Sequence, residues 1–369
     1  MKKVLRWSIP MTIPLILLGG CAKENSGEIQ VVRVWSAEAD GTEEARFEKI
    51  DDQEIGVGMV TDEGGIDDQS FNMSAWEGLQ VLCENKGVTT GYIVPESEAE
   101  FYDSFVSMAD AGYGLCWGIG YAGADAMLQA AADRPDTHFA IVDNAYEETP
   151  FNVTAVVFQA QEPSFIVGYI AAAVTHTGKI GFIGGMENEV IDSFRYGYQA
   201  GAEYAKFLYG KNVEIAVDYA GSYDDEEKGY EMARQMYADG CDIIFHAAGG
   251  TGIGVIRAAK DTGQYVIGVD RDQSDLAPEN VLTSALKNVN IAVEMVSETY
   301  LRGEDIGGKT YRFGMTEGAV GIPENHSNYR DEIYDFALIV MDKIKSGEIV
   351  PPINAEEYEA YLNLLENEK

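Results

Sequence analysis

Two glycine-rich motifs have spacings that suit phosphate binding. Residues 303–310, GEDIGGKT, match the P-loop pattern GxxxxGK[ST], and residues 118–123, GIGYAG, match the GxGxxG pattern of dinucleotide-binding loops. Either pattern binds phosphate only where a strand enters the loop and a helix leaves it. The P-loop match has the reverse order, with a helical pattern before it and the strand-like KTYRFGM after it. We therefore do not expect nucleotide hydrolysis.

The GxGxxG match does lie between a strand and a helix, so an NAD-dependent enzyme is a rival hypothesis. Such a fingerprint normally follows the first strand of its domain, whereas this one follows about the third. Tight turns in a parallel sheet explain it more simply. The sequence has no GxSxG or HExxH motif and its four histidines are scattered. We expect no catalysis, no metal site and no cofactor.

The most informative stretch runs DEGGIDDQSFNMSAWEGL from Asp62, where the first apolar strand pattern, IGVGMV, ends. Gly64 and Gly65 allow a close turn. Asp68 or Ser70 can cap the helix that follows. An aromatic residue at position 71, at the start of that helix, would point over the ends of the strands.

This stretch resembles the signature DxGGxxDxSFNxxAWxGL of the basic membrane protein family, the PnrA-like, purine-nucleoside-binding lipoproteins of bacterial ABC transporters. Further matches follow in the family's order: FNVTAVVFQAQEPSFIVGYIAA, KIGFIGGMENEVIDSFRYGYQAG, HAAGGTGIGVIRAAK, VIGVDRDQ, NVLTSALKNV and GEIVPP. The resemblance spans residues 55 to 352. It implies a non-enzymatic α/β protein with the type I periplasmic-binding-protein fold, in which two doubly wound parallel-sheet lobes enclose a ligand cleft.

The resemblance also implies which residues bind the ligand: Asp62, Phe71, Asn72, Asp143, Phe194, Gly249, Gly250, Asp270 and Lys287. Phe71 and Phe194 would stack on the two faces of a purine, one from each lobe. Asp143 would accept hydrogen bonds from the purine edge. Asp270 would accept from both ribose hydroxyls, with Lys287 keeping it ionised.

The remaining positions have less specific roles. Asp62 and Asn72 would reach the ribose or the base, and the backbone of Gly249 and Gly250 would approach the sugar closely. The implied ligands are guanosine, inosine and adenosine, captured by lobe closure and passed to an ABC permease and ATPase. Riboflavin or a sugar as ligand, or a role as a membrane-attached sensor, are the alternatives.

Alternating strand and helix patterns from residue 55 onward must position these residues. Continuously apolar strands separated by helices predict parallel sheets covered on both faces, and two sheets of five or six strands fit the length better than one. The predicted lobes are 55–158 with about 280–318, and 159–279 with about 319–352, followed by a tail at 353–369. Gly-rich turns follow several strands, at the sheet edge where ligands bind.

The N-terminus predicts the location of the protein. Residues 1–20 read as a lipoprotein signal peptide ending in LGG, with lipidation at Cys21 and a tether over 21–54. We expect a protein anchored by lipid to the extracytoplasmic face of the cell membrane. A net charge of −36 makes nucleic acid an improbable partner, because phosphate backbones would be repelled.

Overall fold

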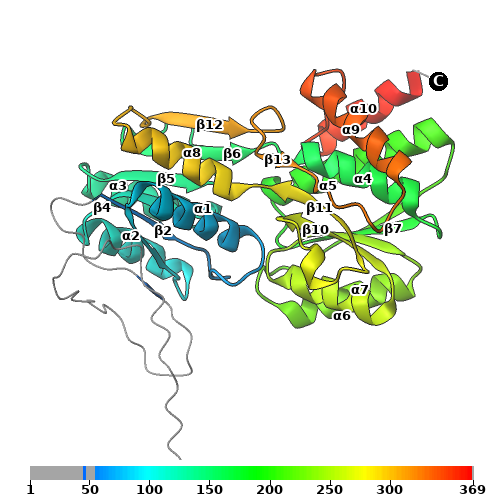
Figure 1. Ribbon diagram of the computed structural model, residues 1–369, viewed down its shortest axis with the longest axis horizontal. Coiled ribbons are helices and arrows are strands. Elements are labelled where there is room, and N and C mark those ends of the chain that lie inside the picture. Colours follow the sequence, from blue (N-terminus) through cyan, green and yellow to red (C-terminus); the bar gives the residue numbers. More distant parts are fainter. Residues whose placement is uncertain (1–44, 47–54, 368–369) are drawn as a thin grey trace, which may run out of the picture.

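The computed structural model describes residues 45–46 and 55–367 of the chain (Figure 1). The predicted signal peptide, Cys21 and nearly all of the predicted tether lie outside the described residues. The described chain forms two lobes, each built on one sheet, and both are visible side by side in Figure 1.

The first lobe contains a seven-stranded sheet in the order β1-β3-β2-β4-β5-β6-β12. Its strands are β1 (Ala45–Arg46), β2 (Gly56–Val60), β3 (Thr89–Ile93), β4 (Tyr113–Gly118), β5 (His138–Val142), β6 (Val153–Phe158) and β12 (Lys309–Phe313). Its helices are α1 (Phe71–Lys86), α2 (Phe101–Asp110), α3 (Ala124–Asp133) and α8 (Val289–Leu301). Only β1 is antiparallel to its neighbour in this sheet.

The second lobe contains a six-stranded sheet in the order β13-β11-β10-β9-β7-β8. Its strands are β7 (Lys179–Gly184), β8 (Glu214–Tyr219), β9 (Ile243–Ala247), β10 (Tyr265–Asp270), β11 (Val281–Lys287) and β13 (Val320–Gly321). Its helices are α4 (Gln161–Val174), α5 (Glu189–Tyr209), α6 (Glu226–Ala238), α7 (Thr251–Thr262), α9 (Asp331–Lys345) and α10 (Ala355–Asn367). The short β13 is the antiparallel member.

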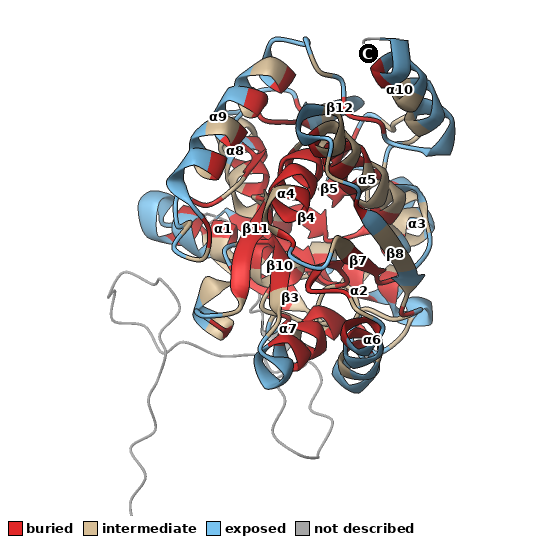
Figure 2. Cartoon of the chain, turned by 90° about the vertical axis from the view of Figure 1, so that its right-hand side faces the viewer, coloured by how far each residue is buried: buried red, intermediate tan, exposed pale blue. Residues whose placement is uncertain are grey.

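Each sheet has a separate hydrophobic core on each face. In the first lobe, α1 and α8 cover one face and α2 and α3 cover the other. In the second, α4, α5 and α9 pack on one face and α6 and α7 on the opposite one. Figure 2 shows the buried strands inside helices whose outer faces are exposed. This is the predicted doubly wound arrangement, and short edge strands explain the extra strand of the first sheet.

The two lobes repeat one topology. In each lobe five strands have the same spatial order, β3-β2-β4-β5-β6 in the first and β8-β7-β9-β10-β11 in the second. Helices α1 and α5 each follow the first strand of this repeated set, β2 and β7. Residues at equivalent strand ends can therefore approach a common space from opposite sides.

The chain passes between the lobes after β6, after β11 and after β12. Strand β11 pairs with β10 from Val266 opposite Val281 to Asp270 opposite Leu286, so it belongs to the second sheet. The division of the chain into lobes remains a proposal in its detail, and this pairing moves its middle boundary from about 280 to just beyond Lys287. The predicted tail contains α10, whose Tyr358 and Tyr361 contact Tyr196 and Phe165 of the second lobe.

Helices α4 and α5 pack closely because small residues face each other across their interface. A Cβ atom on Gly201 would lie 1.8 Å from the carbonyl oxygen of Phe165, and one on Gly168 would lie 2.1 Å from that of Tyr198. Because α5 also supplies residues to the space between the lobes, this packing fixes part of that space.

Gly201→Ala should therefore lower the free energy of unfolding by about 2–3 kcal/mol, since the helices must separate to accept the methyl group. Urea unfolding measures the change. Gly210→Ala is the comparison, because Gly210 has a φ of +64° but no heavy atom within 4 Å of its Cβ position. That variant should lose only about 1–2 kcal/mol through backbone strain. If Gly201→Ala costs less than Gly210→Ala, close helix packing is not the reason for the glycine.

Candidate functional site

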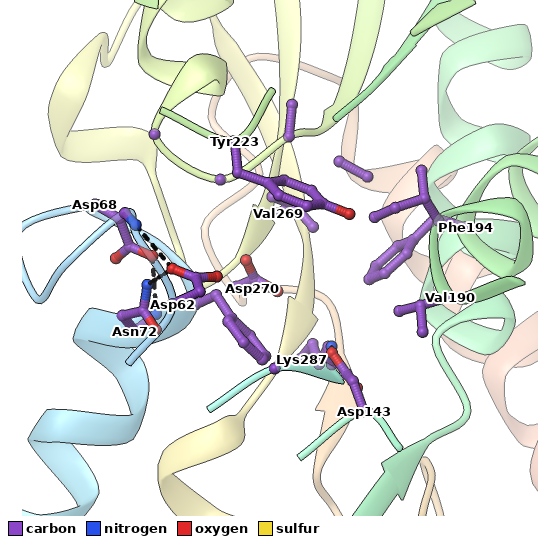
Figure 3. A pocket seen from close by; sticks show the side chains of 18 of the residues that line it. Asp62, Asp68, Asn72, Asp143, Val190, Phe194, Tyr223, Val269, Asp270 and Lys287 are labelled. Atoms are coloured by element: carbon purple, nitrogen blue, oxygen red, sulfur yellow. Dashed lines mark hydrogen bonds and ion pairs between the residues drawn. The ribbon is translucent and has the colours of Figure 1, made fainter. Parts of the chain in front are cut away.

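A cavity that is partly open to solvent lies between the two lobes. Its walls contain all nine residues predicted to bind the ligand: Asp62, Phe71, Asn72, Asp143, Phe194, Gly249, Gly250, Asp270 and Lys287. Figure 3 shows several of these side chains directed into the same space from both lobes. The structure thus brings the predicted residues together, while their contacts with a ligand remain predictions.

Two aspartates occupy equivalent strand ends in the two lobes. Asp143 directly follows β5 and Asp270 ends β10, the fourth strand of the repeated topology in each case. Both have left-handed backbone conformations, with φ of 63° and 64°. Such conformations are uncommon outside glycine, although Asp tolerates them better than most residues. The turn directs both carboxylates into the cavity instead of along the strand.

Phe71 and Phe194 approach the cavity from opposite lobes. Phe71 begins α1 and Phe194 lies in α5, the equivalent helix of the second lobe. The ammonium of Lys287 lies 4.6 Å from the ring centroid of Phe71, 5.7 Å from that of Phe194 and 5.3 Å from that of Phe158. Attraction between a cation and an aromatic face operates at these distances.

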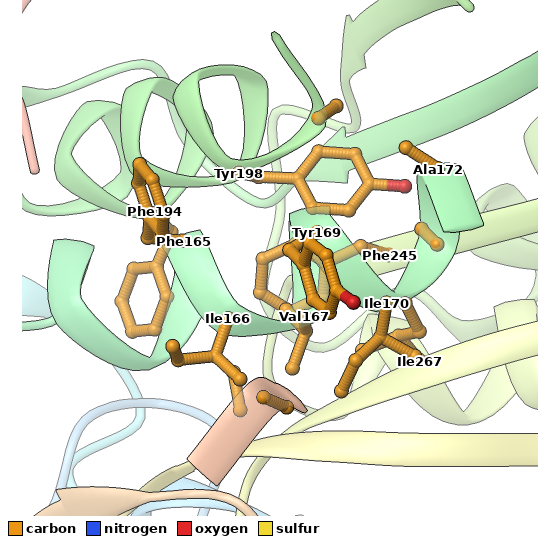
Figure 4. Packing of buried hydrophobic residues seen from close by; sticks show 14 of the residues in the cluster. Phe165, Ile166, Val167, Tyr169, Ile170, Ala172, Phe194, Tyr198, Phe245 and Ile267 are labelled. Atoms are coloured by element: carbon orange, nitrogen blue, oxygen red, sulfur yellow. The ribbon is translucent and has the colours of Figure 1, made fainter. Parts of the chain in front are cut away.

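Phe194 is also part of the hydrophobic core of its lobe. Only 2% of its surface is exposed, and its ring lies 6.3 Å from that of Phe245. Figure 4 shows it among the buried side chains of this cluster. Its position is therefore fixed by the packing of α5 against α4 and the sheet, whereas Phe71 is only half-buried.

The ammonium of Lys287, predicted to keep Asp270 ionised, forms its ion pair with the Oδ2 of Asp143. The reason is the lobe arrangement, since Lys287 ends β11 and faces the strand end of β5 across the cleft. Asp270 instead accepts a hydrogen bond from the hydroxyl of Ser70 in the first lobe. Lys287 still lowers the pKa of Asp270 through its charge.

Asp68 organises the start of α1. Its carboxylate accepts from the backbone N–H groups of Ser70 at 3.0 Å, Asn72 at 2.8 Å and Met73 at 3.0 Å. Of the two predicted capping residues, Asp68 is therefore the one that caps. The amide of Asn72 donates to Asp62 Oδ1 at 2.6 Å, and Asn72 Oδ1 has no hydrogen-bond partner among the described residues. That buried acceptor is available to a donor in the cavity.

The cavity is acidic. Four carboxylates line it, those of Asp62, Asp68, Asp143 and Asp270, with the ammonium of Lys287 as the one cation among the lining residues. Burial raises the pKa of Asp270 to about 6, against the opposing effects of Lys287 and the Ser70 hydroxyl. Burial likewise raises the pKa of Asp62 to about 6, and raises that of Asp68. Such a lining offers acceptors to hydrogen-bond donors and repels negative charge.

Sequence reasoning missed part of the cavity wall. Tyr223, in the loop after β8, directs its ring toward the cavity, and its hydroxyl lies 3.4 Å from that of Tyr121 in the other lobe (Figure 3). Asn188, the N-cap of α5, donates to both hydroxyls at 3.1 Å. In the sequence, Tyr223 is recognisable only as an aromatic residue shortly after a strand. Many loops contain such a residue, so this feature does not identify a cavity wall. Val190 and Ile191 add apolar surface from α5.

The glycines of the GxGxxG match serve packing. Gly118 ends β4, and a Cβ there would lie 2.8 Å from Met127 Cε. A Cβ on Gly123 would lie 3.0 Å from the ring of Phe101. Gly120, with a φ of +100°, lines the cavity beside Asp62 and Phe71. The turn brings the backbone close to the cavity and leads into α3, but it follows the third strand of the repeated topology, whereas a dinucleotide loop follows the first.

Comparison with known proteins agrees with this geometry. Residues 55–355 match the family described as ABC transporter substrate-binding protein PnrA-like. Basic membrane protein A of Borreliella burgdorferi is 42% identical over 312 residues, covering 83% of this chain and 90% of that protein. Basic membrane protein A2 of Borrelia garinii subsp. bavariensis is 42% identical over 305 residues, covering 81% and 89%.

Solved structures show the same fold. A solute-binding protein of an ABC transporter system from Aeropyrum pernix superposes with a TM-score of 0.76 at 26% identity, covering 85% of this chain and 98% of that chain. A transcriptional activator from Bacillus halodurans has a TM-score of 0.68 at 23% identity over 80% of this chain and 99% of that chain, which shows a shared fold alone. The two sheets with interleaved helices thus form a two-lobed fold of the periplasmic-binding-protein type.

The pKa of Asp270 makes the stability of the ligand-free protein depend on pH. Because this pKa is raised from 3.8 to about 6, the folded protein holds the proton more tightly than the unfolded chain, and the stabilisation is lost as pH rises through 6. From pH 5 to 7.5, the wild type should lose about 1 kcal/mol of unfolding free energy relative to Asp270→Asn. Urea unfolding at both pH values measures this loss. The exposed Asp275→Asn, from the same loop, should track the wild type. A parallel response of wild type and Asp270→Asn would contradict the assignment.

Proposed function

Because the chain belongs to the family of PnrA-like ABC-transporter substrate-binding proteins, we propose that it captures purine nucleosides outside the cytoplasm for import. Members of this family are non-enzymatic, extracytoplasmic and membrane-associated, and they bind small molecules for transporter components. Membership agrees with the resemblance inferred from the sequence motifs. Among the described residues, no helix is both long and apolar enough to cross a membrane. We propose that a lipid on Cys21 provides the attachment, and that an ABC permease and ATPase receive the ligand.

One observation carries the proposal of a nucleoside. Two phenyl rings from opposite lobes, Phe71 and Phe194, line a cavity that also holds strand-end carboxylates. A flat heterocycle between the rings would gain stacking energy of about 1–3 kcal/mol per aromatic contact. In this structure the ammonium of Lys287 lies near both rings. A bound base would either displace the ammonium or lie next to it.

The polar groups suit the rest of a nucleoside. We assign the ribose hydroxyls to Asp270, whose carboxylate accepts from Ser70 and keeps further acceptor capacity. We assign the purine edge to the Asp143–Lys287 pair, which offers one acceptor and one donor. We place the sugar beside the backbone of Gly249 and Gly250, where a side chain would crowd the carbonyl oxygen of Tyr223, 3.2 Å from both Cβ positions. The acidic lining would disfavour a phosphate group.

Ligand contacts from both lobes would stabilise the closed state, and release requires the lobes to open. Closure therefore couples capture to docking on the permease. A nucleoside bound at micromolar affinity corresponds to about 8 kcal/mol, which two stacked faces and a few charge-assisted hydrogen bonds can supply.

A thermal-shift panel tests the ligand class. Guanosine, inosine and adenosine at about 100 times their dissociation constants should each stabilise the protein by about 2.7 kcal/mol, a rise of several degrees in Tm. At the same concentration as guanosine, 2′-deoxyguanosine should raise Tm less, because it lacks one hydroxyl for Asp270. Guanosine monophosphate should raise Tm less still, because its phosphate is repelled by the acidic lining. Riboflavin, ribose and NAD complete the panel. A shift with riboflavin or ribose and none with the nucleosides would replace the proposed ligand.

Phe71→Ala should weaken guanosine binding more than tenfold, because the base loses one stacking surface. Isothermal titration calorimetry measures the affinity. Phe151→Ala is the matched control, since Phe151 belongs to the same lobe and is 73% exposed outside the cavity. Unchanged affinity in Phe71→Ala would show that this ring does not stack on the ligand.

A further inference from the structure

The loop after β10 reaches across to the other lobe at three of its residues. Asp270 accepts from Ser70, as described above. Arg271 contacts Glu77 and Met73 of α1, and Gln273 donates to the backbone carbonyl of Gln69 at 3.1 Å. The sequence DRDQ of the second lobe thus faces the turn and first helix of the first lobe. Only Asp270 among its residues lines the cavity.

Arg271 makes its cross-lobe contact outside the cavity. Its Nη2 lies 2.8 Å from Glu77 Oε1, and the two side chains are 31% and 41% exposed. Met73 and Glu77 lie four residues apart on α1, so one guanidinium can contact both on the same helix face. Burial raises the pKa of Asp68, the residue that caps α1, and the charge of Arg271 opposes this rise.

Gln273 provides a second, rigid connection. Its Oε1 accepts from Val269 N at 3.0 Å and its own N–H donates to Ser284 at 3.2 Å, both within the second lobe. The side chain is 2% exposed. Its Nε2 is therefore held toward Gln69, a residue in a left-handed conformation with a φ of 53°. This connection joins the two lobes in the arrangement that the structure shows.

We infer that Arg271, with Gln273, is a positioning residue for lobe closure. Together with Gln69, Met73 and Glu77 these residues form the Arg271 clasp, which favours the closed state without touching the ligand. The clasp therefore slows opening, and its effect on ligand release rests on the proposed function. The contacts of Tyr121, Asn188 and Tyr223 join the lobes at another part of the cavity rim, but Tyr121 and Tyr223 line the cavity.

Arg271→Gln tests the clasp in the full chain. An ion pair of this exposure corresponds to about a two- to fivefold change in an equilibrium or rate. We expect guanosine dissociation, followed by stopped-flow competition, to accelerate two- to fivefold while the association rate changes less. Glu77→Gln should give the same acceleration. The reversed pair Arg271→Glu with Glu77→Arg should recover much of the native dissociation rate.

The control is Arg257→Gln. Arg257 forms a similar ion pair with Glu227, at 2.6 Å, but both residues belong to the second lobe. Its loss should leave the dissociation rate unchanged. A further readout needs no ligand: spin labels at the exposed positions Asp103 and Glu231, one on each lobe, report the distance distribution between the lobes. Arg271→Gln should increase the open fraction two- to fivefold, and Arg257→Gln should not.

The two readouts distinguish failure of the clasp from failure of the proposed function. If guanosine does not bind the native protein, the nucleoside proposal fails while the spin-label distances still test the clasp. If Arg271→Gln and Glu77→Gln match Arg257→Gln in distance distribution, the clasp does not hold the lobes together. If guanosine also dissociates faster from the reversed pair, to the same extent as from Arg271→Gln, the faster dissociation has a cause other than loss of the ion pair.

Discussion

The cavity depends on one buried ammonium among carboxylates. Lys287 is 3% exposed, pairs with Asp143 and lies over aromatic rings supplied by both lobes. Four aspartates line the same space, and burying their charges without a counterion would be costly. The chain supplies the counterion from the end of β11, next to one of its passages between the lobes. The ammonium therefore offsets part of the negative charge in the cavity and also contacts groups from both lobes.

The repeated topology explains why the opposing groups resemble each other. The helix after the first strand provides Phe71 in one lobe and Phe194 in the other, and the fourth strand ends at Asp143 or Asp270. The turn after the third strand provides Gly120 and Gly249, both with positive φ. The two similar lobes face each other with the carboxyl ends of their strands. Each lobe therefore supplies an aromatic ring, a carboxylate and a glycine turn to its side of the cavity. A flat ligand can be contacted on both faces in such a space.

Apolar runs are local signals that predicted the strands and helices, and the family resemblance implied the nine residues that line the cavity. Interactions between the lobes were less accessible. The sequence did not predict the ion pair of Lys287 with Asp143, because no local pattern determines which strand end an ammonium meets. Tyr223 was missed because its loop has no periodicity. The middle lobe boundary was placed before β11 because a buried strand gives no indication of which sheet it joins.

The raised pKa values of Asp62 and Asp270 indicate which interactions a bound ligand should supply. Carboxylates whose pKa is raised by burial have lost water without gaining enough donors in return, as Asp62 and Asp270 have. A neutral ligand that donates hydrogen bonds supplies part of the lost solvation, so its binding becomes more favourable in the closed cavity than in an open one. An anion adds charge of the same sign and gains nothing from closure. Under the proposed function, ligand selectivity and lobe closure would therefore share one electrostatic origin.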